Sequence, residues 1–63
     1  MDNNHLYNLM TQCTQEMKSL WRIEKHYMNE SESEEEKVFW RNMKADKENH
    51  IKEIKELIKK TLA

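Results

Sequence analysis

The chain has 63 residues, of which 37% are charged, and its formal net charge is −1. It has no glycine, no proline and one cysteine, which argues against β-hairpins and excludes an internal disulfide. A nearly neutral chain is a poor partner for nucleic acid, no apolar run could span a membrane, and the first ten residues do not resemble a signal peptide. We therefore expect one all-α domain, residues 1–63, that is soluble and cytoplasmic and has neither nucleic-acid nor membrane partners.

The first predicted helix runs from about residue 4 to residue 28, with Asp2 or Asn3 as its cap. Its apolar residues recur every three or four positions, which is the helical period, and they form a stripe wider than one neighbouring helix requires. These residues are Leu6, Leu9, Met10, Cys13, Met17, Leu20, Trp21, Ile23, Tyr27 and Met28. Glu24 falls inside this stripe and Glu16 near its edge.

A connection over about residues 29–33 and a second helix over about residues 34–62 follow. Without glycine, Asn29 is the expected residue to end the first helix in a left-handed conformation. Ser33 and Glu36 have the spacing of a capping box, and Lys59 and Lys60 are suitably placed near the far end of the second helix. The sequence therefore predicts two helices with a short turn between them.

So short a turn requires the two helices to be antiparallel, and residues whose numbers add up to roughly 62 or 63 should then face one another. This register pairs Trp21 with Trp40, Glu16 with Lys47, and Cys13 with His50. Both helices still carry apolar surface that a single hairpin cannot cover. We expect a homodimer, or a higher homo-oligomer, in which two hairpins form a four-helix bundle.

Polar residues that fall on the apolar stripes are the candidates for chemistry. With the second stripe centred on Phe39, His50 falls near its middle, Lys47 inside it and Asp46 at its edge. One interpretation is a transition-metal site with Glu16, His50 and possibly Asp46 as ligands, suited to iron, manganese or zinc. The alternative is a metal-free scaffold or interaction module, in which Glu16 pairs with Lys47 and Asp46 with His50.

Two stretches, "EMKSLWRIEKHY" and "KVFWRNMKADKENHIKEIKEL", together resemble the helical hairpin of the ferritin-like and rubrerythrin superfamily. The resemblance covers about residues 13–60. It implies half of a four-helix bundle, completed by dimerisation, with a metal centre that usually holds two iron ions. Glu16 matches the ligand on the first helix, His50 the histidine ligand, and Asp46 the acidic residue before the bridging glutamate.

The bridging position itself is occupied by Lys47, whose ammonium group cannot bridge two metal ions. Three arrangements remain open: a reduced mononuclear site, a shifted site that uses Asp46, and no metal at all. By resemblance alone, the expected role is iron handling, with at most a ferroxidase or peroxide-related activity.

Overall fold

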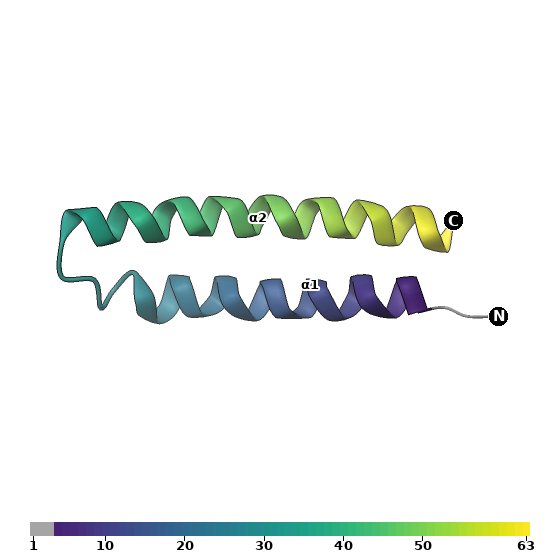
Figure 1. Cartoon of the computed structure of the whole chain (residues 1–63), viewed down its shortest axis with the longest axis horizontal. Helices are drawn as coiled ribbons and strands as arrows, with labels where there is room; N and C mark the ends of the chain where they lie inside the picture. Colours follow the sequence, from purple (N-terminus) through teal and green to yellow (C-terminus); the bar gives the residue numbers. More distant parts are fainter. Residues whose placement is uncertain (1–3) are drawn as a thin grey trace.

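The computed structural model describes residues 4–63, which form two long antiparallel helices joined by a tight turn (Figure 1). The first helix, α1, spans Asn4–Arg22 and continues into a π-helical turn, η1, over Ile23–Tyr27, and the second helix, α2, spans Glu34–Leu62. No strand occurs among residues 4–63. The molecule measures 50 × 14 × 13 Å, a single layer of two helices. The expected all-helical hairpin is confirmed, whereas Asp2 and Asn3, the expected caps, lie outside the described residues.

The start of α2 is fixed by its capping box. The Ser33 backbone is extended, with φ −134° and ψ 160°, and its Oγ accepts a hydrogen bond from the Glu36 N–H at 3.1 Å. Glu36 Oε2 in turn accepts from the Glu32 N–H at 3.4 Å. The first bond satisfies a backbone donor that a helix start leaves without an intrahelical partner, and the second ties the residue before the cap to α2. The three glutamates of the first turn add favourable charge.

The first helix ends differently from the prediction. Asn29 was expected in a left-handed conformation, but no non-glycine residue of the described chain has a positive φ. Side chains bind the last carbonyl groups instead: Asn29 Nδ2 donates to the Lys25 oxygen at 3.2 Å, and Ser31 Oγ donates to the Tyr27 oxygen at 2.8 Å. These two bonds satisfy carbonyl groups that the helix end leaves open.

The π-helical turn η1 changes which side of the chain faces α2. The Met28 N–H donates to the Ile23 oxygen at 3.0 Å, a bond that closes a turn one residue wider than an α-helical turn. Ile23 is buried, and Met28, five positions later, is half-buried. The ring centroid of Tyr27 is 4.9 Å from that of Trp40.

The two helices meet along a narrow seam of residues spaced alternately three and four apart, as in a coiled coil. From α1 the seam contains Leu6, Leu9, Cys13, Glu16, Leu20 and Ile23. From α2 it contains Lys37, Trp40, Lys44, Lys47, Ile51, Ile54, Ile58 and Thr61. Only Cys13, Glu16, Ile23 and Ile51 are buried among the described residues, so the core of one hairpin is very small.

Large apolar side chains remain exposed on α1 beside this seam. Tyr7, Met10, Met17 and Trp21 are 68%, 53%, 48% and 54% exposed, and their spacing places them along one face of the helix. We call these four residues the α1 apolar stripe. Val38, Phe39, Leu57 and Leu62 are exposed on α2. Neither helix of the described part of the chain has the length and apolar character needed to cross a membrane.

The predicted contact between Trp21 and Trp40 is wrong. Trp40 packs its ring against Tyr27 and Phe39, whereas Trp21 packs edge-on against His26, with the ring centroids 5.2 Å apart. Trp21 belongs to the α1 apolar stripe and Trp40 to the seam. A straight helical projection placed both in broad stripes, but a single neighbouring helix covers only a narrow part of each.

Candidate functional site

The best-defined polar cluster of the molecule is built around Glu16, a carboxylate that is only 7% exposed. The Lys47 Nζ lies 2.9 Å from Glu16 Oε2, which confirms that these two residues face one another across the hairpin. On the other oxygen, Oε1, Gln12 Nε2 donates a hydrogen bond at 3.1 Å and His50 Nδ1 approaches to 3.6 Å. One residue of α1, Gln12, and two residues of α2, Lys47 and His50, therefore surround the Glu16 carboxylate.

The spacing of the seam explains why these polar groups are inside the hairpin. Glu16 follows Cys13 by three residues and precedes Leu20 by four, while Lys47 follows Lys44 by three and precedes Ile51 by four. Both residues therefore occupy positions that face the partner helix. Lys47 has a side chain that is 20% exposed, so its methylene groups line the seam while its ammonium group reaches Glu16.

The surroundings of Glu16 stabilise its charged form. The Lys47 ammonium group has the largest effect and lowers the pKa of Glu16 below its ordinary value of 4.5, with further lowering by Gln12 and His50. Burial acts in the opposite direction, because it disfavours the charge, but it does not prevail. Oε2 is buried and lacks a well-aligned hydrogen bond, so its contact with Lys47 is mainly an ion pair.

Of the other two proposed ligands, His50 lies near Glu16 and Asp46 makes no contact with it. His50 lies at the margin of the seam with its side chain 49% exposed, and it approaches Glu16. Asp46 is exposed, and among residues 4–63 its side chain makes no hydrogen bond or ion pair, so the expected bond between Asp46 and His50 does not form. Both had been placed by centring the stripe on Phe39, which is itself 53% exposed. The true seam runs through Trp40, Lys44 and Lys47.

The cluster does not fit the dinuclear metal site that the resemblance implies. Glu16 and His50 are two donors, and the described residues hold no group of three or more histidine, cysteine, aspartate or glutamate side chains arranged to hold a metal ion. The ammonium group of Lys47 occupies the space beside Glu16 Oε2 where a cation would bind. The donor set present is thus that of a neutralised carboxylate with a histidine nearby.

Two other polar contacts depart from the sequence-based interpretation. Gln12 had not been considered, although its position four residues before Glu16 is the usual spacing for such a side-chain pair. Glu24 was expected well inside the stripe, but its side chain is 39% exposed and lies 4.0 Å from Lys44 in a surface ion pair. The Cys13 thiol, for its part, points to the Met17 sulfur at 4.0 Å, a contact within α1.

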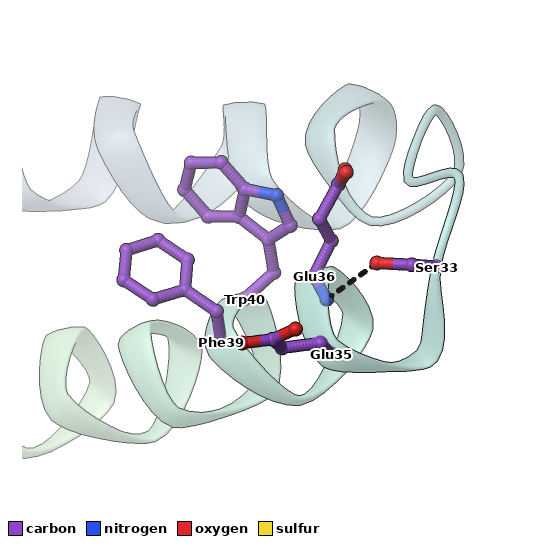
Figure 2. A pocket seen from close by; sticks show the side chains of 5 residues that line it. All are labelled: Ser33, Glu35, Glu36, Phe39 and Trp40. Atoms are coloured by element: carbon purple, nitrogen blue, oxygen red, sulfur yellow. Dashed lines mark hydrogen bonds between the residues drawn. The ribbon is translucent and has the colours of Figure 1, made fainter.

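Among the hollows on the surface of residues 4–63, two lie beside features described above. The one at the turn is an open pocket of about 480 Å³ lined by Ser33, Glu35, Glu36, Phe39 and Trp40 (Figure 2). Its apolar wall is formed by the Phe39 and Trp40 rings, whose centroids are 5.0 Å apart at an interplanar angle of 76°.

The other hollow is a groove of about 330 Å³ lined by Met17, Leu20, Trp21, Glu24, Ile51 and Lys55. It includes half of the α1 apolar stripe, so this face of the hairpin is both apolar and concave.

Comparison of the chain with protein-family models, with curated proteins and with solved structures finds no match.

Proposed function

We propose that this chain is a helical interaction module that works without a metal ion. In this proposal the hairpin packs its remaining apolar surface against further helices and completes a four-helix bundle. The observation that carries the proposal is the ion pair between Glu16 and Lys47, 2.9 Å apart within the seam.

The ion pair supports a structural role for this cluster because it already balances the charge of Glu16. A metal site needs a carboxylate that is free to bind a cation, whereas this one accepts from Gln12 and faces Lys47. Buried ion pairs of this kind add little net stability, but they penalise other registers, in which either charge would face an apolar residue. Glu16 and Lys47 would therefore fix how α1 and α2 are aligned.

The small core supports the need for a partner. A chain of this size usually requires a metal, a disulfide or another subunit to be stable, and Cys13 is the only cysteine. The α1 apolar stripe and the groove beside it provide a surface that another helix could cover. Packing against helices would bury this surface in the same way as the seam buries its own apolar residues.

Thermal melts with and without metal ions test this proposal. Ferrous, manganous and zinc ions, added one at a time to metal-free protein, should leave the melting temperature unchanged. The melting temperature of the variant His50→Ala should likewise be unchanged by these ions. Asp46→Ala serves as a control at an exposed carboxylate. Stabilisation of the parent by any of these ions, lost in His50→Ala, would overturn the proposal.

A transition-metal site, with iron as the first candidate, is the second possible function. The observation in its favour is the convergence of Glu16 and His50, whose Oε1 and Nδ1 atoms lie 3.6 Å apart. Lys47→Glu tests it, because this change removes the cation and places a carboxylate three residues before His50. Metal-dependent stabilisation of this variant but not of the parent would show a ferritin-like scaffold in which Lys47 blocks the site.

A further inference from the structure

We propose that the partner covering the α1 apolar stripe is a second copy of this chain, packed antiparallel to the first with a two-fold axis near Thr14. This inference rests on the proposed function and deepens it by naming the partner and its orientation. Three independent features of the hairpin support it: the symmetry of the stripe, the shape of the adjoining groove, and the distribution of charge along the molecule.

The stripe is symmetrical about Thr14. Tyr7 and Trp21 lie seven residues on either side of Thr14, and Met10 and Met17 lie four and three residues from it. In an antiparallel dimer each copy therefore sets Tyr7 against Trp21 of the other copy, and Met10 against Met17. Thr14 is small, and its Oγ1 already donates to the Met10 oxygen at 3.0 Å, so burial at the axis leaves this hydroxyl satisfied.

The groove beside the stripe gives these side chains a place to pack. Met17, Trp21 and Leu20 form much of its wall, and Trp21 is held by edge-on contact with His26 at 5.2 Å. A Tyr7 ring from the second copy, which is 68% exposed in the hairpin, would enter the groove next to Trp21. Such aromatic pairs, with one ring in a preformed pocket, are typical anchors of protein interfaces.

The charge distribution favours the antiparallel over the parallel arrangement. Residues 30–36 at the turn contain five glutamates and no basic residue. The open end of the hairpin carries Lys55, Lys59 and Lys60 near the end of α2, with one glutamate, Glu56, among them. Because Thr14 is close to midway along the molecule, antiparallel copies place the acidic turn of each beside the basic end of the other. A parallel dimer would bring the two acidic turns together.

The area is sufficient for a stable dimer. Side chains of this size, about half exposed, each offer roughly 100 Å² for burial, so the four residues of the stripe supply about 400 Å² per copy. A standard interface buries about 800 Å² per partner, of which somewhat more than half is apolar. The stripe therefore provides most of the apolar part, and the flanking polar side chains provide the rest.

Disulfide trapping tests the orientation. With Cys13 replaced by alanine, a single cysteine is introduced as Thr14→Cys, Met10→Cys or Gln15→Cys, and each protein is oxidised mildly. Near the axis of an antiparallel dimer, Thr14→Cys should give a covalent dimer. Met10→Cys should not, because the two Met10 positions would be offset by about 12 Å, well beyond the reach of a disulfide. Gln15→Cys is the control for disulfides that form by random collision, because residue 15 lies about 100° around the helix from residue 14. This variant should remain without a disulfide.

Sedimentation equilibrium of the parent completes the test, and twice the monomer mass is expected. Cross-linking of both Thr14→Cys and Met10→Cys would indicate a parallel dimer and overturn the inference. A dimer in which Thr14→Cys fails to cross-link, or does so no faster than Gln15→Cys, would overturn it as well. A folded monomer at about 100 μM would exclude self-association, yet an unchanged melt with metal ions would still support the interaction module.

Discussion

At the scale of single residues, the main polar feature of the seam is the ion pair between Glu16 and Lys47. Glu16 is 7% exposed, and its charge persists there because Lys47 and Gln12 replace the water it has lost. Lys44, one turn earlier on α2, makes a similar pair with Glu24, but that pair is 4.0 Å long and more exposed. The two pairs form a natural comparison, since they share residue types and differ in burial.

We predict that Lys47→Met destabilises the hairpin by about 1–3 kcal/mol, because it leaves a buried carboxylate without its counter-charge. Lys44→Met, at the exposed pair, should cost less than about 0.5 kcal/mol. Urea denaturation of the two variants and the parent measures the difference. The double variant Glu16→Met with Lys47→Met should recover the parent stability or exceed it. Equal losses in the two single variants would mean that Glu16 is as well solvated as Glu24.

The lowered pKa of Glu16 predicts how stability depends on acidity. Because the folded pKa lies below the unfolded value, the stabilising effect is fully present above the unfolded pKa, the ordinary value of 4.5, and is lost as the pH falls through the folded pKa. Glu16→Gln should therefore flatten the acid side of the stability profile measured by urea denaturation between pH 7 and pH 2. Glu56→Gln, at an exposed position, should leave the profile unchanged, and an identical effect of the two changes would contradict this assignment.

At the scale of elements, α2 is well defined at its start, and the end of α1 is shaped by its π-helical turn. The wide turn at Ile23–Tyr27 ends at the half-buried Met28 and places the Tyr27 ring against Trp40. The end of α1 and the start of α2 are thereby held together by an aromatic contact close to the turn. The capping box at Ser33 then sets the first turn of α2.

We expect Ser33→Ala to destabilise the hairpin by about 1 kcal/mol, because the Glu36 N–H loses its acceptor. Thr11→Ala is a suitable control, since Thr11 is an exposed residue in the middle of α1. The change in the free energy of unfolding, measured by urea denaturation, decides the question. A loss no greater than that of the control would show that α2 starts without help from this cap.

The two tryptophans should respond differently to truncation. Trp40→Ala should cost about 2–4 kcal/mol at any protein concentration, because Trp40 is in the seam and packs on Tyr27. Trp21→Ala should cost little in dilute protein and more as the concentration rises, because Trp21 lies on the face assigned to the second copy. Urea denaturation of each variant at two protein concentrations separates these effects. A concentration-independent loss in Trp21→Ala would place Trp21 in the fold of the single hairpin.

At the scale of the whole molecule, stability should depend on association. A rod 50 Å long and only two helices thick buries few side chains, and its exposed stripe lies on one face. We predict that the melting temperature rises by a few degrees for each tenfold increase in protein concentration, because association stabilises the folded hairpin relative to the unfolded chain. Met17→Gln should weaken association about tenfold and lower the melting temperature at every protein concentration at which the parent is a dimer. A melting temperature independent of concentration would indicate that the hairpin is stable alone.

The amino-acid sequence by itself determined the helices and their alignment. The lack of glycine and proline, the three- and four-residue spacing, and the Ser33–Glu36 pair are local signals, and local hydrogen bonding makes them effective. The alignment also followed from sequence, because a short turn leaves little choice of register. Glu16 and Lys47 were therefore placed opposite one another correctly.

Only the tertiary structure decided which residues of each broad apolar stripe became buried. A helical projection gives the direction of a side chain, but a single neighbouring helix covers a seam much narrower than the stripe. Lys44 and Lys47 consequently lie in the seam, while Phe39, Asp46 and His50 are exposed. The π-helical turn adds a further shift that no periodic pattern contains, because it accompanies the packing of Tyr27 against Trp40 of α2. The sequence thus predicted correctly that Glu16 and Lys47 face one another, but the packing of the helices decided which other side chains lie near this pair.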